Sequence, residues 1–244
     1  MPQFEAAFPV RAITLDLDDT LWPFAPIGAR VETVQHDWLR THCPRTAACF
    51  PIPAMRELRD RLNAQHPHLA HDFSAMRRLT LEHAMREAGD DPALAEAAFE
   101  AFFAERNRVE FYPDALPALA RLSARAPLAA LSNGNADLVR IGVHGHFRFQ
   151  LGARDHGAPK PSASIFLAAC ERLGVEPAHV LHVGDDVEMD VVGAAQAGLR
   201  TCWLNREEHA WPRADIAPDL QLPTLTALAD WLDAARPSLD IAAA

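Results

Sequence analysis

Short apolar runs that end in polar clusters recur along the chain and predict buried strands. Residues 11–21, RAITLDLDDTL, begin with apolar and β-branched side chains and end in carboxylates. The same pattern recurs at residues 128–131 before SNGN, at 180–183 before GDD and at 201–204 before NRE. Continuous apolar runs are typical of parallel strands covered on both faces. Because helical patterns separate these runs, we expect an α/β fold with a Rossmann-like parallel sheet flanked by helices.

Residues 22–110 show a different pattern, because no convincing strand interrupts four helical segments. Apolar side chains recur there at helical spacing, which favours the packed core of a small bundle over a ligand-specific role. The stripes that carry this prediction are Val31, Val34 and Trp38, then Met55, Leu58 and Leu62, and finally Phe99, Phe102 and Phe103.

These two patterns predict how the chain is divided into domains. An α/β core is expected from residues 1–21 and 111–236, so that it is discontinuous in sequence. An all-helical cap is inserted between its two parts at residues 22–110. The Ala-rich stretch 237–244 is expected to be a frayed tail, because chain termini are commonly poorly ordered.

Capping residues mark where several helices begin and end. Asp and Ser accept hydrogen bonds from the first free N–H groups of a helix, and glycine favours the left-handed conformation that ends one. On this basis the predicted N-caps are Asp91, Asp114 and Ser162, and the predicted terminating glycines are Gly89 and Gly174.

Composition narrows the class of protein. The chain has 244 residues, of which 49% are hydrophobic and 23% charged, which is typical of soluble globular proteins. Its net charge of −10 is the opposite of the basic surplus of nucleic-acid binders, and an anionic membrane surface would repel it. The four cysteines form no CxxC pair, which fits a reducing compartment. With no signal peptide or membrane span apparent, we expect a cytoplasmic protein that binds neither nucleic acid nor membranes.

Two acidic clusters follow predicted strands. Asp16 and Asp18 are two residues apart, so continued strand geometry would place both side chains on one side. Asp185, Asp186 and Asp190 follow another strand, and the carboxyl ends of parallel strands meet at one crevice. Carboxylates held together need a cation, and hard oxygen ligands suit Mg²⁺. Either cluster alone is better explained by helix capping, which is the role we expect for Asp186.

A polar turn and a lysine favour a binding site over helix capping alone for these acids. Ser132 follows a third predicted strand, and with Asn133 and the next two residues it forms a turn whose hydroxyl and N–H groups could hold phosphate oxygens. Lys160 lies between prolines just before a predicted helix, which fixes its ammonium near the same crevice. Alone, Ser132 would be a turn residue and Lys160 a solvated lysine. Together with the acids, they predict a site for a phosphate group.

The ends of the helical insertion hold further candidates. Thr20 is expected to hydrogen-bond within the loop that leads into the cap. Trp22 begins the insertion, where packing is the favoured role; the alternative is that it lines the entrance, stacks on a planar part of the substrate and sets selectivity. Arg106 and Arg108 could reach an anionic substrate, although solvated arginines at a helix end are commoner.

The motifs occur in the order Asp-x-Asp-x-Thr, Ser-Asn, Lys and Gly-Asp-Asp-x-x-x-Asp, each at a predicted strand end. In this the chain resembles the haloacid dehalogenase superfamily of phosphohydrolases, in the subclass with a helical cap inserted after the first motif. The matching stretches are DLDDTLW, LSNGN, KPSASIF and HVGDDVEMDVVGAAQAGLRT, and the resemblance runs from Arg11 to about Leu232. It implies a three-layer α/β core with strand order 5-4-1-2-3.

The resemblance implies the reacting groups. Asp16 matches the nucleophile that attacks phosphorus and forms an aspartyl-phosphate, which water then hydrolyses. Asp18 matches the general acid and base, with its backbone carbonyl on the metal. Because a carboxylate and a phosphate dianion repel one another, such a site needs positive charge beside Asp16.

The resemblance also implies the groups that bind metal and phosphate. Asp185 matches the third metal ligand, and Asp190 matches the acid that supports the metal shell and positions Lys160. Ser132 and the backbone amide after it match the phosphate-binding turn. Lys160 matches the residue that steadies the charge on the nucleophile and on the transferred phosphoryl group.

The function implied by this resemblance is Mg²⁺-dependent hydrolysis of a phosphomonoester of a small metabolite. A phosphomutase with the same pair of acids and a non-hydrolytic phospho-acceptor module remain alternatives, and a true dehalogenase would have no use for Asp18. A cap over the crevice disfavours large protein substrates. Among relatives, the nearest likeness is to bacterial phosphatases of flavin-pathway and sugar-phosphate type.

Overall fold

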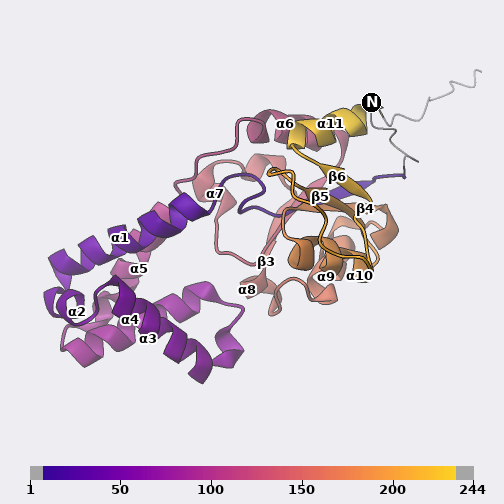
Figure 1. Ribbon diagram of the computed structural model, residues 1–244. Coiled ribbons are helices and arrows are strands. Elements are labelled where there is room, and N and C mark those ends of the chain that lie inside the picture. The colour runs from indigo at the N-terminus through magenta and orange to yellow at the C-terminus, as the bar shows by residue number, and fades with distance from the viewer. Residues whose placement is uncertain (1–7, 235–244) are drawn as a thin grey trace, which may run out of the picture.

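The computed structural model describes residues 8–234 and has two lobes (Figure 1). One lobe contains a sheet of six parallel strands in the order β3-β2-β1-β4-β5-β6, among the residues described. This confirms the predicted α/β class and contains the expected order 5-4-1-2-3, with β6 added beyond β5. The strands are β1 (Ala12–Leu15), β2 (Leu128–Ser132), β3 (Phe149–Gly152), β4 (Val180–Gly184), β5 (Arg200–Leu204) and β6 (Leu220–Leu222).

The central strand β1 brings the sequence motifs to one edge of the sheet. Leu15, its last residue, is in register with Ala130 of β2 on one side and with Val183 of β4 on the other. All three strands run in the same direction, so the residues that follow them emerge together. The polar clusters at the ends of β1, β2 and β4 therefore share one crevice.

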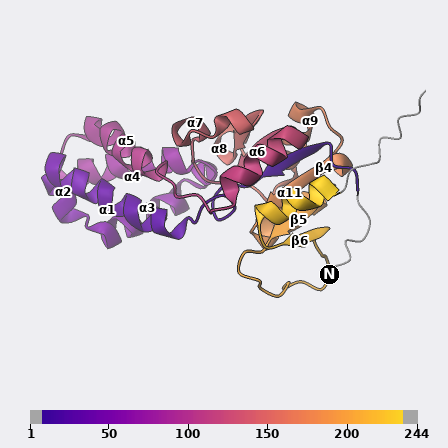
Figure 2. The same ribbon diagram turned by 90° about the horizontal axis from the view of Figure 1, so that it is seen from above.

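Helices cover both faces of the sheet, which explains the unbroken apolar runs of its strands. Ile13 and Leu15 belong to the same buried cluster as Leu119 and Leu228 of the helix layer formed by α6 and α11. Ala12 and residues of β2 and β4 pack instead against the layer formed by α9 and α10, which Figure 1 shows on the other side of the sheet. Figure 2 looks onto the layer formed by α6 and α11. The helices of this lobe are α6 (Ala115–Arg125), α7 (Leu138–Ile141), α8 (Ala153–His156), α9 (Ala163–Leu173), α10 (Gly193–Gln196) and α11 (Leu225–Ala234), with a π-helical segment at Val187–Val192.

The second lobe consists of helices between residues 25 and 106, and α1 packs along α5. The residues that α1 buries are Ile27, Val31, Gln35 and Leu39, so its inward face is rotated from the predicted stripe and Val34 is only half-buried. Five α-helices form in place of the four predicted segments: α1 (Ala25–His42), α2 (Pro44–Cys49), α3 (Ile52–Gln65), α4 (Phe73–Ala88) and α5 (Ala95–Arg106). None of the helices in the described chain is long and apolar enough to cross a membrane.

Three of the five predicted helix ends hold in the structure. Gly89 and Gly174 end their helices in the left-handed conformation, and the Asp91 carboxylate accepts a hydrogen bond from the N–H of Ala93 in a short 3₁₀ turn. Asp114 and Ser162 occupy N-cap positions but make no side-chain cap. The Asp114 carboxylate instead pairs with Arg206 and accepts the N–H of Leu225 at the start of α11. The 3₁₀ turns are Pro67–Leu69, Pro92–Leu94, His144–His146 and Pro177–His179.

Candidate active site

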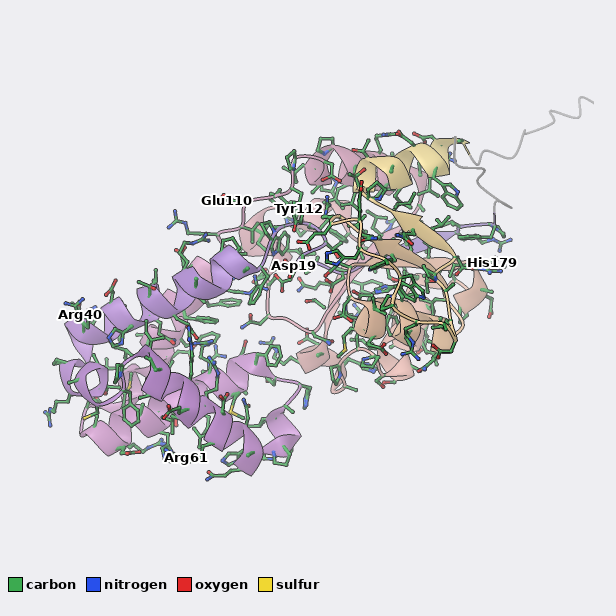
Figure 3. The ribbon with its side chains drawn as sticks, viewed as in Figure 1. Asp19, Arg40, Arg61, Glu110, Tyr112 and His179 are labelled. Atoms are coloured by element: carbon green, nitrogen blue, oxygen red, sulfur yellow. The ribbon has the colours of Figure 1, made fainter. Side chains whose placement is uncertain are left out.

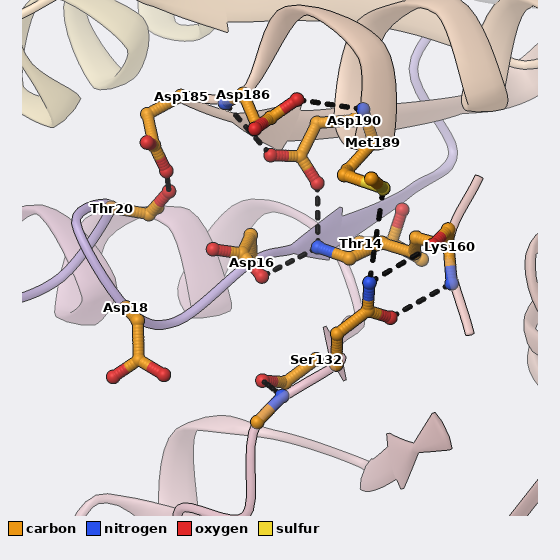
Figure 4. A network of polar contacts seen from close by, with 12 residues as sticks. Thr14, Asp16, Asp18, Thr20, Ser132, Lys160, Asp185, Asp186, Met189 and Asp190 are labelled. Carbon is orange, nitrogen blue, oxygen red and sulfur yellow. Dashed lines mark hydrogen bonds and ion pairs between the residues drawn. The ribbon is translucent and has the colours of Figure 1, made fainter. Parts of the chain in front are cut away.

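A buried lysine joins two of the acidic motifs at the sheet edge (Figure 4). The Lys160 ammonium lies 2.5 Å from a carboxylate oxygen of Asp16 and 2.5 Å from one of Asp190. Its side chain is only 3% exposed, so both contacts are shielded from water. Lys160 is also the only lysine in the chain, since the other 22 basic residues are arginines. A compact ammonium fits between two carboxylates where a planar guanidinium would not, which explains why this position holds a lysine in a chain whose other basic residues are arginines.

The surrounding backbone explains how these groups come so close. Asn133 holds the Lys160 loop from both sides, because its Oδ1 accepts the Lys160 N–H at 2.8 Å and its Nδ2 donates to the Lys160 carbonyl at 2.9 Å. Gly184 lies against Asp190 so closely that any side chain there would clash with it. The Asn133 side chain is thus committed to the lysine loop, and only its backbone amide remains for phosphate.

Asp190 is the best-connected acid of the site. One of its oxygens accepts from Lys160 and from His182 Nε2, which lies 3.0 Å away, and the other accepts the N–H of Asp186 at 3.0 Å. His182 in turn contacts the Thr14 hydroxyl at 2.8 Å, inside the sheet. His182 and Thr14 were not singled out by sequence. A histidine and a threonine inside otherwise apolar strands were the available signal, because buried polar groups need partners.

The two carboxyl groups that contact Lys160 have pKa values shifted in opposite directions. Burial raises the pKa of Asp16 well above its ordinary value, and Lys160 only partly opposes this shift. Burial also acts to raise the pKa of Asp190, but Lys160 and His182 hold it well below its usual range. Burial alone would lower the pKa of Lys160, yet the two acids raise it. Asp190 is therefore the permanent counter-charge of the lysine, which leaves Asp16 poised to accept a second cation.

The acids also form a cluster that could hold a metal. Ligand atoms of Asp16, Asp185 and Asp190 lie within 4.8 Å of one another. The Thr20 hydroxyl donates to Asp185 at 3.0 Å, and burial followed by the charge of Asp190 raises the pKa of Asp185 to about 7. Asp16 and Asp185 each keep one oxygen without a hydrogen-bond partner among the described residues. Free, hard oxygens of crowded acids fit Mg²⁺.

The predicted phosphate-binding turn follows β2 beside this cluster. The Ser132 hydroxyl is buried and accepts the N–H of Gly134 at 3.0 Å, so its own hydrogen is free to donate. A side chain at Gly134 would come within 2.8 Å of an Asp18 oxygen and 3.3 Å of the Ser132 hydroxyl. The absence of a side chain there lets the turn lie directly against Asp18.

Asp18 does not lie beside Asp16 as strand geometry would require. The strand β1 ends at Leu15, and the Asp18 carboxylate points away from the Lys160 group (Figure 4). Asp18 accepts hydrogen bonds from Trp22 Nε1 at 2.8 Å and from Arg106 Nη2 at 2.6 and 2.9 Å. Its side chain is thus no member of the acidic cluster, and any contribution to a metal would come from its backbone carbonyl.

Trp22 is a structural residue of the hinge and does not line an entrance. Its side chain is completely buried, and its ring packs edge-on against Phe111 at 5.5 Å between ring centroids. The chain turns back at Asp19, which has a φ of 58°, and this places Trp22 alongside Asp18. The structure therefore agrees with the favoured packing role, and the alternative that Trp22 stacks on a substrate is wrong, because no face of its ring is accessible.

Arg106 is a site residue, which corrects the interpretation of it as a solvated arginine. It is the last residue of α5 and is only 2% exposed, whereas Arg108 is exposed. Besides pairing with Asp18, it donates from Nε to Asn135 at 3.3 Å, so it joins the helical lobe to the phosphate-binding turn. Its Nη1 is buried without a hydrogen-bond partner.

Asp186 is placed as predicted, since its carboxylate caps the next helical segment by accepting the N–H groups of Glu188 and Met189.

A cavity of about 470 Å³ adjoins Asp18 and Arg106 between the two lobes. The helices α1, α3, α4 and α5 supply most of its wall, and the segment between β1 and α1 and the phosphate-binding turn supply the rest. Asp19 and Tyr112, labelled in Figure 3, lie where the helical lobe meets the sheet. A group bound at the acidic cluster would therefore extend into a chamber built largely by the helical lobe.

Acids and one lysine at the edge of a Rossmann-like sheet, beneath a helical lobe, are features of an enzyme. The sequence matches the haloacid dehalogenase-like hydrolase family over residues 10–198. The chain belongs to this family, which confirms the resemblance seen in its motifs.

Individual relatives differ in their reactions. The chain is 32% identical to 5-amino-6-(5-phospho-D-ribitylamino)uracil phosphatase YigB of Escherichia coli (strain K12) over 227 residues, which cover 90% of this chain and 94% of that one. It is 38% identical over 148 residues to a phosphoserine phosphatase of Thermus thermophilus, covering 58% and 59% of the two chains. A solved structure of a 2-haloacid dehalogenase from Pseudomonas syringae pv. Tomato DC3000 is similar with a TM-score of 0.88 and 37% identity, covering 93% of this chain and all of that one.

Proposed function

We propose that the protein is a Mg²⁺-dependent phosphatase that hydrolyses the phosphomonoester of a small metabolite through an aspartyl-phosphate on Asp16. The observation that carries the proposal is the buried Lys160 ammonium between Asp16 and Asp190, next to the free oxygens of the acidic cluster. Positive charge beside a carboxylate nucleophile serves attack on an anionic substrate. The phosphatase relatives support the same reaction class.

In the first step, an Asp16 oxygen attacks phosphorus while the bond to the leaving alcohol breaks. Ser132 donates its hydroxyl hydrogen to a phosphoryl oxygen, and Lys160 balances charge on Asp16 and on the phosphoryl group. Asp18 gives a proton to the departing oxygen. The products of this step are the free alcohol and a phosphoryl group bonded to Asp16.

In the second step, water attacks the phosphorus of the aspartyl-phosphate. Asp18, now ionised, accepts a proton from that water, and the bond between phosphorus and the Asp16 oxygen breaks. Inorganic phosphate leaves and both acids return to their starting states. Arg106 and Trp22 hold the Asp18 carboxylate in one orientation through both steps.

Asp16 and Asp185 are the side chains that would hold Mg²⁺, with the Asp18 backbone carbonyl as a third ligand and Asp190 behind them. When bound, Mg²⁺ offsets the negative charge of Asp16 and of the phosphoryl oxygens. Burial and neighbouring acids raise the pKa values of Asp16 and Asp185, and a bound cation would favour their ionised forms.

Mg²⁺ affinity is expected to rise about tenfold from pH 6 to pH 8. The pKa of Asp185 is raised to about 7, so at the lower pH this carboxyl carries a proton that the metal must displace. Titration calorimetry at both pH values measures the affinity and the proton release directly. In the Asp185→Asn protein, binding should be weaker and its pH dependence smaller. An affinity that does not change with pH in the wild type would contradict the ligand assignment.

Arg106→Met is expected to lower kcat/KM, which reports the step that releases the alcohol, about tenfold or more for alkyl phosphates and far less for p-nitrophenyl phosphate. An alkoxide needs the proton that Asp18 supplies, whereas nitrophenolate leaves without one, and Arg106 orients Asp18. Arg108→Met is the matched control, because that arginine lies two residues away with an exposed side chain. Equal losses on both substrates would show that Arg106 acts only on the fold.

Dehalogenation is the second candidate reaction, because a solved structure that is 37% identical to this chain is named a 2-haloacid dehalogenase. That reaction needs no proton donor for its halide leaving group, so it would not use Asp18 as a general acid or Arg106 to orient it. Incubation with acetyl phosphate and with 2-chloropropionate distinguishes the two by the release of phosphate or of chloride. A phosphomutase would instead return an isomeric phosphate ester, and a phospho-acceptor module would stay phosphorylated.

The substrate is proposed to be a small phosphorylated metabolite, and the setting to be the cytoplasm. A cavity of about 470 Å³ has room for a leaving group of metabolite size and none for a folded protein. The Escherichia coli relative is named for a small phosphorylated uracil derivative, which supports the same size class.

A further inference from the structure

The cavity beside Asp18 contains one arginine, Arg77, whose guanidinium is in direct contact with no acid among the described residues. Arg106 pairs with Asp18, and Arg59 lies 3.8 Å from Glu32, which also binds Arg56 outside the cavity. Arg77 forms no ion pair with any described residue. Its Nη1 donates to Gln35 at 2.9 Å, and its guanidinium lies 3.8 Å above the Phe102 ring. Arg77 lines the chamber that receives the leaving group, and its remaining N–H groups make no hydrogen bond with any described residue.

Arg78, the next residue on the same helix, provides a comparison, because its guanidinium is paired with an acid. Its guanidinium lies 3.5 Å above the Phe99 ring, so it stacks much as Arg77 does. Arg78, however, makes a two-pronged contact with Glu96 at 2.6 and 2.9 Å and does not line the cavity. Stacking on phenylalanine is therefore common to both arginines, and the missing acid is particular to Arg77.

Aromatic rings form the apolar part of the same cavity. Phe24 and Phe73 line it and are 39% and 54% exposed, although most large hydrophobic side chains in the described chain are buried. Phe73, Met76 and Arg77 lie on one face of α4 at helical spacing, so their side chains enter the chamber together. Exposed rings beside an unpaired planar guanidinium favour a flat partner.

The charge of the wall decides which polar group that partner carries. Three acids and three arginines line the cavity: Asp18, Asp19, Glu32, Arg59, Arg77 and Arg106. When all three acids are ionised these charges balance, and the wall then offers no net attraction for a second anion. Individual N–H groups of Arg77 still need an acceptor, and a neutral carbonyl oxygen supplies one.

We propose that this cavity binds the leaving alcohol through a flat ring bearing a carbonyl oxygen, with Phe24 and Phe73 against the ring and Arg77 donating to the oxygen. The inference rests on the proposed phosphatase function and specifies the leaving group of its substrate. It also assigns the selectivity that was expected of Trp22 to residues whose side chains face the chamber. Selectivity must come from such groups, because the phosphoryl site treats all phosphomonoesters alike.

Three probes test the proposal. Uridine 5′-monophosphate carries a flat ring with carbonyl oxygens, ribose 5-phosphate has the same sugar without the ring, and 3-phosphoglycerate has a carboxylate without a ring. Wild-type kcat/KM is expected to be at least about tenfold higher for the uridine ester than for the other two. Arg77→Met should raise KM for the uridine ester about tenfold with little change in kcat, and should affect ribose 5-phosphate much less.

Matched variants separate recognition from folding. Arg78→Met removes the stacked but acid-paired neighbour and should leave the preference for the uridine ester intact. Phe73→Ala removes an exposed ring at small structural cost and should reduce the same preference. Equal losses on all three esters in Arg77→Met, or a preference of the wild type for either ring-less probe, would overturn the proposal.

A binding measurement keeps the inference independent of turnover. The Asp16→Asn protein is titrated with the same three esters by calorimetry. Tighter binding of the uridine ester, weakened by Arg77→Met in that background, supports the ring site even if no phosphate is released. Equal binding of all three esters overturns the ring site, and absence of phosphate release from every ester in the wild type overturns the proposed function alone.

Discussion

Replacing Asp16 with Asn is expected to lower kcat for phosphomonoester hydrolysis by about a thousandfold or more. An amide nitrogen cannot attack phosphorus, while the side chain keeps its shape and can still accept the Lys160 hydrogen bond. The fold should therefore persist and substrate should still bind. Steady-state phosphate release measures the loss, and mass spectrometry of acid-quenched protein should show the phosphoryl adduct in the wild type but not in Asp16→Asn.

The matched control for this variant is Asp186→Asn. Asp186 belongs to the same acidic group, but its carboxylate accepts only the N–H groups of the following helical segment. Asn caps helices as well as Asp does, so activity should change by only about a factor of two or three. If the Asp16→Asn protein retained more than a tenth of wild-type kcat, the covalent mechanism would be wrong.

Replacing Lys160 with Met is the second large expected effect, because it acts on catalysis and stability together. The nucleophile loses the cation beside it, and kcat/KM should fall about a hundredfold to a thousandfold. The same change leaves Asp16 and Asp190 buried and facing one another without compensation. Breaking a buried ion pair in this way costs about 3–5 kcal/mol of the free energy of unfolding.

The stability loss in Lys160→Met should depend on pH in a defined direction. Without the ammonium, burial raises the folded-state pKa of Asp16 further above its ordinary value, because Lys160 is the group that opposes this shift in the wild type. A raised carboxyl pKa means that protonation favours the folded state, so the variant should regain stability as the pH falls from 7 towards about 5. Denaturant unfolding at several pH values measures this. A loss that did not vary with pH would contradict the assignment of Lys160 as counter-charge.

Lys160→Arg distinguishes positive charge from fit. A guanidinium keeps the charge but is too broad for the space between two carboxylates 2.5 Å from one ammonium nitrogen, so activity should still fall strongly while stability falls less. The wild-type ammonium can be observed directly, because ¹⁵N-lysine labelling of a chain with a single lysine reports on that group alone. Its signal should show a protonated amine across the neutral range.

The parts of the fold that sequence predicted well are those with strong local patterns. The strands β1, β2, β4 and β5 are unbroken apolar runs, and continuous burial on both faces leaves such runs no polar alternation. The edge strands β3 and β6 were not located, since β3 is half-exposed at its start and β6 has only three residues. Edge strands of this kind carry too few buried positions to form a readable pattern.

The site residues that sequence alone could select are also those with a clear local pattern. Asp16, Ser132, Asp185 and Lys160 follow apolar runs or prolines, so residue type and position along the chain were sufficient to select them. Sequence by itself determined which acids reach the sheet edge, because parallel strands release their next residues on one side.

Only the tertiary structure decided how the remaining side chains are used. Arg106 is separated from Asp18 by 88 residues, and nothing local distinguishes it from exposed Arg108 two positions on. Asp18 points away from the place expected of it because β1 ends at Leu15 and the chain then turns at Asp19. Burial and partner depend on which helix of the second lobe packs over the sheet edge. That packing depends on contacts between residues far apart in sequence. The local sequence therefore determines which strand a residue follows, whereas the helical lobe determines how its side chain is oriented and which partner it contacts.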